Sequence, residues 1–305
     1  MPQLRYLVLA GPTAVGKTEV AVRIAQGLET DIIGCDAFQI YRGLEILTTK
    51  PSASQLSCVR HHLIGTLPLT ERCDAHKYGV LARQTVAGLN RNGIVPLVVG
   101  GTGFYLQALE GAVPPLPAAN ITLRQALDRF STSELLRNLE ARDPVASNRI
   151  DRHNRRRIVR ALEVCMLSGK RFSDFLERIP TDPPLGVILL DRPRAELVAR
   201  IDRRVDEMFD RGVVEEVARI ETVGSTASQA IGFRPIRSLL AGTIDTFSCK
   251  ELIKQQHRNY AKRQMTWFRR RPYAHISAEA PVDGLIATFR RQLEKVGPGI
   301  EGATG

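Results

Sequence analysis

Short apolar runs alternate with helical patterns along much of the chain. Four runs predict strands, and they are Arg5–Ala10, Asp31–Cys35, Ile94–Val99 and Gly186–Leu190. Nearly continuous apolar strands separated by helices, such as the pattern at Lys17–Leu28, are typical of a parallel sheet with helices on both faces. The pattern therefore predicts the α/β class with a doubly wound parallel sheet. Further helices are expected at Glu196–Arg211, Val213–Ile220, Phe233–Leu240 and Lys250–Arg270.

Two proline clusters divide the chain. Val113–Pro117 (VPPLP) and Ile179–Pro184 (IPTDPP) bracket a stretch with helical patterns and no strand pattern, which indicates an inserted helical subdomain. We therefore expect a first part of the core at residues 1–115, a helical insertion subdomain at 116–185, and a second part of the core with C-terminal helices at 186–296. The glycine-rich tail at 297–305 is expected to be disordered.

A glycine-rich motif follows the first predicted strand. It reads Gly11-Pro12-Thr13-Ala14-Val15-Gly16-Lys17-Thr18, a complete G-x-x-x-x-G-K-[ST] between a strand and a helix. In such a P-loop, backbone N–H groups and the helix N-terminus bind phosphate oxygens, the lysine reaches a terminal phosphate, and the threonine can ligate Mg²⁺. The motif predicts a di- or triphosphate with magnesium but does not specify a nucleotide; the alternative is a simple glycine turn.

Polar residues follow the predicted strands, where ligands bind in sheets of this kind. Asp36 is a candidate general base, with a role at Mg²⁺ or as a helix cap as alternatives. Gly100–Tyr105 includes Thr102, whose hydroxyl could meet a substrate, although a tight strand–helix turn explains the glycines equally well. His61 and His62 are adjacent, so on a strand they point to opposite faces; this is poor geometry for one metal and favours a hydrogen-bonding role.

The chain is basic, with 43 Lys and Arg against 32 Asp and Glu and a formal net charge of +11. Such a balance is typical of proteins that bind polyanions, although a merely basic surface is the alternative. Two clusters stand out, Arg152–Arg160 and Lys262–Arg271, and the second contains Trp267, the single tryptophan. Together they favour a surface for a phosphate backbone, with a stacking element, over ordinary solvated helix faces.

Cysteine usage and hydropathy point to the cytoplasm. The five cysteines are scattered and form no C-x-x-C pair, so neither a disulfide framework nor a zinc site is indicated. The first apolar run leads directly into the glycine loop, unlike a signal peptide. The longest uncharged stretch, Ile94–Leu109, is too short and too rich in glycine to span a bilayer. We expect a cytoplasmic protein with no membrane partner.

Eight motifs occur in a recognisable order. They are Gly11–Thr18, Asp36–Gly43 (DAFQIYRG), Lys50-Pro51, His61–Ile64, Gly100–Tyr105, Arg156–Val164 (RRIVRALEV), Ala230–Arg234 (AIGFR) and Lys262–Arg269 (KRQMTWFR). In this order, from about residue 5 to about residue 272, the chain resembles the tRNA dimethylallyltransferases, also called tRNA isopentenyltransferases. The resemblance is to the bacterial form. It implies a P-loop α/β core with a helical insertion, and transfer of a dimethylallyl group from dimethylallyl diphosphate to N6 of adenosine 37 in the tRNA anticodon stem-loop, with release of diphosphate.

The resemblance also implies residue roles. Gly11–Thr18 would hold the diphosphate with Mg²⁺ on Thr18, Asp36 would accept the proton of the adenine amine with Thr102 nearby, and Lys17 and Arg204 would stabilise the leaving diphosphate. The implied tRNA contacts are Asp36, Ala37, Phe38, Gln39, Thr102, Arg124, Arg156, Arg157, Ile158, Val159, Arg160, Gln229, Ala230, Ile231, Gly232, Phe233, Arg234, Lys262, Arg263, Gln264, Met265, Thr266, Trp267, Phe268 and Arg269. Ala37 stands where the family commonly has serine. We expect a monomer.

Two other functions share parts of the pattern. A P-loop kinase acting on a small molecule or a nucleotide would have the same loop, a strand-end aspartate and an α/β core, but it would not account for the two basic clusters. A non-catalytic RNA-binding GTPase would need an N-K-x-D motif to recognise guanine, and the sequence contains none.

Overall fold

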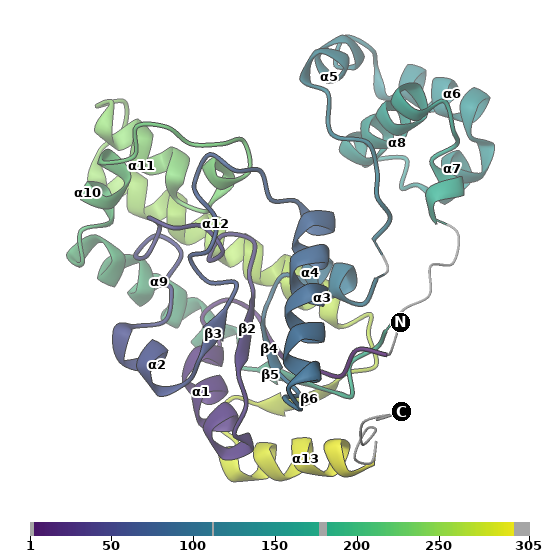
Figure 1. The fold of residues 1–305 in the computed structure, drawn as a ribbon. Helices are drawn as coiled ribbons and strands as arrows, with labels where there is room; N and C mark the ends of the chain where they lie inside the picture. The colour runs from purple at the N-terminus through teal and green to yellow at the C-terminus, as the bar shows by residue number, and fades with distance from the viewer. Residues whose placement is uncertain (1–2, 112, 177–181, 296–305) are drawn as a thin grey trace. The chain divides into compact units, whose positions relative to one another are not determined.

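The computed structural model describes residues 3–111, 113–176 and 182–295. The chain divides into two compact units, one formed by Met1–Glu110 with Asp182–Gly305 and the other by Gly111–Thr181 (Figure 1). The first is an α/β unit and the second is helical. The tail at 297–305 and residues 179–181 of the second proline cluster lie outside the described residues. None of the described helices is both long and apolar enough to cross a membrane.

The α/β unit is built on a parallel sheet in which the described strands are ordered β3-β2-β4-β1-β5-β6. Their bounds are β1 Leu7–Ala10, β2 Ile32–Cys35, β3 His61–His62, β4 Leu97–Gly100, β5 Gly186–Asp191 and β6 Ala274–Ser277. The four predicted strands are present, and the α/β class is confirmed. Every residue of β1 and β2 is buried, which explains their unbroken apolar sequence. The edge strands β3 and β6 were not among the predicted strands, because β3 has only two residues and β6 is mostly exposed and lacks an apolar run.

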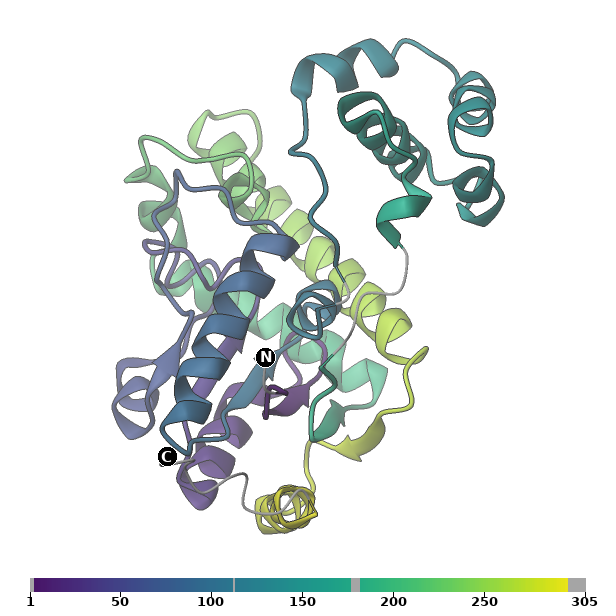
Figure 2. The same ribbon diagram turned by 45° about the vertical axis from the view of Figure 1, so that its right-hand side comes forward.

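Helices cover both faces of this sheet. In Figures 1 and 2, α1 and α13 lie on one face, and α3 and α4 lie on the other. The helices of the unit are α1 Lys17–Leu28, α2 Ala53–Cys58, α3 Ala75–Arg91, α4 Gly103–Leu109, α9 Arg194–Asp210, α10 Val213–Ala218, α11 Phe233–Leu240, α12 Thr246–Phe268 and α13 Val282–Glu294, with a 3₁₀ turn η2 at Ala227–Gln229. Leu9 of β1, Ile24 of α1 and Phe289 of α13 belong to one buried cluster, which fixes the first face.

The strand register brings the predicted site segments to one edge of the sheet. Ala10 lies opposite Gly100 and Leu189, and Cys35 also lies opposite Gly100. The loops that follow β1, β2 and β4 therefore leave the sheet side by side. A Cβ at Gly100 would lie 2.0 Å from the carbonyl oxygen of Cys35, so the close approach of these two strand ends requires glycine.

The helical unit has its own core. Its elements are α5 Ile121–Leu127, α6 Thr132–Arg142, α7 Pro144–Arg149, α8 Arg155–Ser168 and a 3₁₀ turn η1 at Ser173–Leu176. Leu135, Leu139, Ile158 and Leu162 pack in one buried cluster. The N-terminus of α6 is closed by a capping box between Ser131 and Glu134, which satisfies backbone donors that the helix leaves unpaired. The limits of this unit differ by a few residues from the expected 116–185.

Candidate active site

The loop Gly11–Thr18 joins β1 to α1. Gly16 has φ 107°, a conformation that glycine adopts without strain, and α1 begins at the next residue, Lys17. The Lys17 ammonium donates hydrogen bonds to the carbonyl oxygens of Gly11 (2.9 Å) and Pro12 (2.8 Å). Burial, together with the nearby positive charge of Arg204, lowers the pKa of Lys17 to about 7, although Asp36 acts in the opposite direction. A poorly solvated cation without a carboxylate partner in hydrogen-bonding contact is suited to bind an anion.

Side chains from later helices brace this loop. Oε1 of Gln264, on α12, accepts a 2.8 Å hydrogen bond from the backbone N–H of Thr13. Nη1 of Arg204, on α9, donates to the Thr13 hydroxyl at 3.1 Å, and Nε of Arg200 donates to the Ala14 carbonyl at 2.8 Å. Burial and the neighbouring Arg200 lower the pKa of Arg204. Two arginines beside a phosphate-binding loop create a positive site for a strongly anionic group.

Asp36 occupies the first position after β2. Its Oδ1 accepts hydrogen bonds from the backbone N–H groups of Phe38 (2.9 Å) and Gln39 (3.2 Å), so the carboxylate stabilises its own turn. The Phe38 and Gln39 N–H groups both donate to Oδ1. Among the described residues, Oδ2 is therefore the carboxylate oxygen available to a substrate. Thr102 lies alongside, because its hydroxyl accepts from the Ala37 N–H at 3.4 Å and shares a 3.1 Å hydrogen bond with the Tyr260 hydroxyl.

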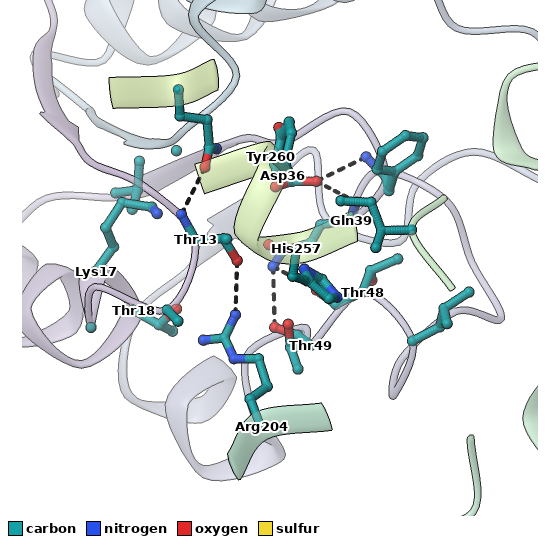
Figure 3. Close-up of a pocket in the computed structure, with 18 of the residues that line it drawn as sticks. Thr13, Lys17, Thr18, Asp36, Gln39, Thr48, Thr49, Arg204, His257 and Tyr260 are labelled. Atoms are coloured by element: carbon teal, nitrogen blue, oxygen red, sulfur yellow. Dashed lines mark hydrogen bonds between the residues drawn. The ribbon is translucent and has the colours of Figure 1, made fainter. Parts of the chain in front are cut away.

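The P-loop and the start of the segment after β2 line one cavity of about 240 Å³ (Figure 3), whereas Thr102 lines a different one. Lys17, Thr18, Asp36 and Arg204 all contribute to its wall. The structure thus brings together four of the residues that the sequence singled out. The wall also includes Gln39, Thr48, Thr49, His257 and Tyr260. Of these, Thr48, Thr49, His257 and Tyr260 were not predicted, since the loop after Gly43 and the middle of α12 carry no phosphate-binding motif.

A second cavity, of about 190 Å³, is lined in part by the same segment after β2. Ala37, Thr102, Phe104 and Gln229 help to line it. Phe38 lines both cavities, so the two spaces adjoin at this residue. Phe104 is 56% exposed, which places an accessible aromatic ring at the second cavity.

The donor set fits a magnesium ion that is bound together with a substrate. Thr18 is the second residue of α1 and its side chain lines the first cavity. Across the described ranges, no group of three or more His, Cys, Asp or Glu side chains is arranged to hold a metal. Mg²⁺ commonly takes one or two protein ligands, with waters and substrate phosphate oxygens completing its shell, so a hydroxyl beside a phosphate site matches its requirements.

The basic cluster on α12 is divided between two faces. Lys262, Arg263, Thr266 and Arg269 are exposed, as a nucleic-acid contact requires. Two residues of the same predicted set are buried, Gln264 at 5% and Phe268 at 0% exposure. Gln264 therefore braces the P-loop and Phe268 is a core residue; their place in the tRNA-contacting segment stays a prediction.

The segment Gln229–Arg234 is also divided. Gln229 and Arg234 are exposed, whereas Ala230, Gly232 and Phe233 are buried. Ile231 lines the first cavity. Side-chain contacts with a large partner are therefore restricted to the two ends of this segment, and the buried positions support the start of α11.

In the helical unit, the predicted contact residues fall into three groups. Arg156 and Arg157 are exposed, whereas Ile158 and Val159 belong to the buried core.

Arg124 makes two hydrogen bonds to Glu163, from Nε (2.9 Å) and Nη2 (2.8 Å). Arg160 also binds Glu163, at 2.5 Å, and the Glu163 side chain is fully buried. Arg124 and Arg160 thus have a structural partner, and the role of this segment in tRNA binding stays a prediction.

The histidine pair has the hydrogen-bonding role that was expected. On β3, Nε2 of His62 lies 2.7 Å from Oδ2 of Asp31, and Nδ1 of His61 lies 2.8 Å from the Val59 carbonyl. The two rings thus bind different neighbours, as residues on opposite faces of a strand do.

The fold and the site together define a P-loop α/β enzyme whose P-loop lines a cavity together with a carboxylate. Residues 39–271 match the family model described as IPP transferase. The chain is 38% identical over 282 residues to a tRNA dimethylallyltransferase from Geobacter sulfurreducens, covering 88% of this chain and 90% of that protein. It is 39% identical over 279 residues to one from Chloroflexus aggregans, covering 88% and 94%. The chain belongs to the IPP transferase family, and the resemblance found in the sequence is confirmed.

Solved structures agree with this assignment. A tRNA isopentenylpyrophosphate transferase from Bacillus halodurans superposes with a TM-score of 0.69 at 28% identity, over 96% of this chain and 98% of that one. The corresponding enzyme from Staphylococcus epidermidis gives 0.68 at 27% identity, over 96% and 100%. A eukaryotic dimethylallyltransferase acting on tRNA shares the fold, with a TM-score of 0.81 at 24% identity over 96% of this chain and 80% of that one.

Proposed function

We propose that this protein transfers a dimethylallyl group from dimethylallyl diphosphate to N6 of adenosine 37 in the anticodon loop of tRNA, releasing diphosphate. One observation carries the proposal: the P-loop, Arg204 and Asp36 line a single cavity. A site for a strongly anionic leaving group thus lies beside a candidate base. Membership of the IPP transferase family supports the two substrates, since the relatives are named tRNA dimethylallyltransferases.

In this proposal Asp36 accepts the proton of the attacking amine. The lone pair of adenine N6 is delocalised into the ring, so attack on C1 of the dimethylallyl group is aided by removal of a proton. As the N6–C1 bond forms and the C1–O bond to diphosphate breaks, the proton passes to Oδ2 of Asp36. The other carboxylate oxygen, Oδ1, is the one that accepts the Phe38 and Gln39 N–H groups. A positioned base of this kind contributes ~10²–10⁴-fold.

The leaving diphosphate takes the negative charge of the broken bond. Lys17 and Arg204 are held at the loop before substrate arrives, by the Gly11 and Pro12 carbonyls and by the Thr13 hydroxyl. Removal of one preorganised donor of this type costs roughly 3–4 kcal/mol of transition-state stabilisation. Thr18 would hold the magnesium ion, which supplies further positive charge to the diphosphate when it is bound.

The second cavity suits the approach of the base. It adjoins Thr102 and the exposed ring of Phe104, and it shares Phe38 with the first cavity. Extrusion of a base from its stack costs a few kcal/mol, which contacts with the tRNA backbone can offset. We assign such contacts to exposed basic residues of α12 (Lys262, Arg263 and Arg269) and, on the helical unit, to Arg156 and Arg157.

We expect the enzyme to act as a cytoplasmic monomer. All five cysteines are free, in keeping with a reducing compartment. The kinase alternative is not favoured, because the family match extends over residues 39–271, all of which lie outside the P-loop that the two classes share.

The direct test is incubation of the protein with unmodified tRNA, Mg²⁺ and labelled dimethylallyl diphosphate, followed by mass analysis of the nucleosides. We expect a labelled N6-dimethylallyl adenosine from the anticodon loop. A parallel melting experiment compares dimethylallyl diphosphate with ATP at equal concentration, and the prenyl donor should give the larger stabilisation. Rapid cleavage of ATP with no labelled nucleoside would instead support the kinase.

A further inference from the structure

His257 lies in the cavity but has no part in the mechanism described above. It is carried by α12 and lines the same wall as Lys17 and Arg204 (Figure 3). The side chain is 8% exposed. Among the described residues, neither Nδ1 nor Nε2 has a hydrogen-bond partner.

An unpaired imidazole in such a place destabilises the folded protein. Its two ring nitrogens are removed from bulk water without gaining protein partners, and buried polar groups in native proteins are nearly always paired. A leucine of similar size would fill the same space without this penalty. The ring lines a cavity and is not enclosed in the hydrophobic core. A ligand bound in that cavity can therefore supply the hydrogen-bond partner that the ring nitrogens lack.

The surrounding charges indicate the chemistry of that ligand. Lys17 and Arg204 line the same wall, and Arg204 is bound to the Thr13 hydroxyl of the P-loop. Burial and the positive charge of Arg204 lower the pKa of His257 to about 4, so the ring is neutral near pH 7. A neutral imidazole carries one N–H donor and one acceptor nitrogen. It can thus donate to an anionic oxygen without adding another buried positive charge beside Arg204.

We propose that His257 is a further binding residue for the diphosphate, with one ring N–H donating a hydrogen bond to a diphosphate oxygen. The inference rests on the proposed function, which assigns the diphosphate to this cavity. It adds a neutral donor from α12 to the cations Lys17 and Arg204. One helix then serves both substrates, since α12 also carries the exposed basic residues proposed to bind tRNA.

Titration calorimetry with magnesium pyrophosphate on the full-length protein tests this role. His257→Leu should weaken pyrophosphate binding roughly tenfold or more, the effect of losing a hydrogen bond to a charged group. His257→Asn and His257→Gln carry an amide N–H near the positions of Nδ1 and Nε2, and one of them should retain most of the affinity. The exposed His76 of α3, outside the cavity, provides the matched control: His76→Leu should bind like the unaltered protein.

Melting temperatures separate this role from a structural one. Without ligand, His257→Leu should melt at the same temperature as the unaltered protein or higher, because the substitution removes an unpaired buried polar group. Its stabilisation by pyrophosphate should be smaller. Unchanged pyrophosphate affinity in His257→Leu, or equal loss in all three His257 variants, would overturn the role as a donor.

The same experiments distinguish failure of this inference from failure of the proposed function. If the unaltered protein modifies tRNA while His257→Leu binds pyrophosphate normally, only the inference about His257 is lost. If the unaltered protein neither binds pyrophosphate nor modifies tRNA, both are overturned. Weakened binding in His257→Leu, with retention by Asn or Gln, supports the inference and identifies the nitrogen that donates.

Discussion

The backbone N–H of Thr13 donates a 2.8 Å hydrogen bond to Oε1 of Gln264, although the two residues are 251 positions apart in the chain. Nε2 of the same side chain donates to the carbonyl of Gly101 at 2.9 Å. A single buried amide thus joins the loop after β1 to the loop after β4. Helix α12 thereby holds the phosphate site on its buried face while it presents basic residues on its exposed face.

Substitution of Gln264 should damage the diphosphate site more than the tRNA surface. Gln264→Leu leaves the Thr13 N–H and the Gly101 carbonyl unpaired, at a cost of about 1–3 kcal/mol for each group. We expect a lower melting temperature and a raised KM for dimethylallyl diphosphate, with an unchanged Kd for tRNA. Gln264→Glu keeps the acceptor for Thr13 but sets a carboxylate oxygen against the Gly101 carbonyl, so it should be impaired as well. Equal KM values for the donor in Gln264→Leu and the unaltered enzyme would contradict the bracing role.

Asp36→Asn tests the proposed base with little change in shape. The amide oxygen can still accept from the Phe38 and Gln39 N–H groups, so the turn should persist. Loss of the proton acceptor should lower kcat by ~10²–10⁴-fold, while the Kd for tRNA changes little. Single-turnover rates and filter binding measure the two quantities. Turnover close to that of the unaltered enzyme would remove Asp36 from the base role.

Lys262→Ala should weaken tRNA binding through electrostatics. Lys262 is exposed on α12, and each phosphate contact contributes about 0.7–0.9 to the slope of log Kd against log salt concentration. We expect this slope to fall by about that amount, with KM for the prenyl donor unchanged. Lys295→Ala, at the exposed end of α13, serves as the control and should leave the slope as it is. An equal slope in Lys262→Ala and the unaltered protein would make this lysine a solvated surface residue.

On the helical unit, Arg157 and Arg124 should behave differently. Arg157 is exposed, so Arg157→Ala should reduce tRNA affinity and its salt dependence without a change in melting temperature. Arg124 is bound to the buried Glu163, so Arg124→Ala should lower stability by about 1–3 kcal/mol. Thermal unfolding and tRNA titrations on both variants provide the comparison. Loss of tRNA affinity in Arg124→Ala at unchanged stability would show that Arg124 contacts tRNA directly.

The neutral ring of His257 predicts a pH dependence of stability. Its pKa is about 4 in the folded protein against an ordinary value of 6.5, so between these values the unfolded chain binds more protons. Stability therefore falls as pH decreases from 6.5 towards 4, by up to about 1.4 kcal/mol per pH unit from this group. The other charged or titratable groups that line the same cavity are Lys17, Glu19, Asp36, Arg204 and Tyr260, and they are common to the variant and the unaltered protein.

Denaturant unfolding at pH 6.5 and pH 5 measures this effect. His257→Leu lacks the titrating ring, so its free energy of unfolding should fall by about 2 kcal/mol less than that of the unaltered protein between the two values. The exposed His76 again provides the control, since His76→Leu should follow the unaltered protein. Parallel losses in His257→Leu and the unaltered protein would show that the ring is already protonated in the folded state.

Much of the core and the phosphate loop follows from the sequence alone. The strands β1, β2, β4 and β5 are recognisable because a strand covered on both faces must be apolar along its length. The loop Gly11–Thr18 is equally recognisable, since its glycines and its lysine act through local backbone geometry. Asp36 was found because parallel strands end at a common edge.

Tertiary structure decided which side chains of α12 and α8 face solvent and which face the interior. The two basic clusters are continuous in sequence, yet packing buries Gln264 and Phe268 in one and Ile158 and Val159 in the other. The roles of Gln264 and His257 depend on segments far away in the chain, which no local pattern can encode. Gln264 braces the site because the fold places it against Thr13 and Gly101. His257 faces the cavity because the fold places α12 beside the P-loop.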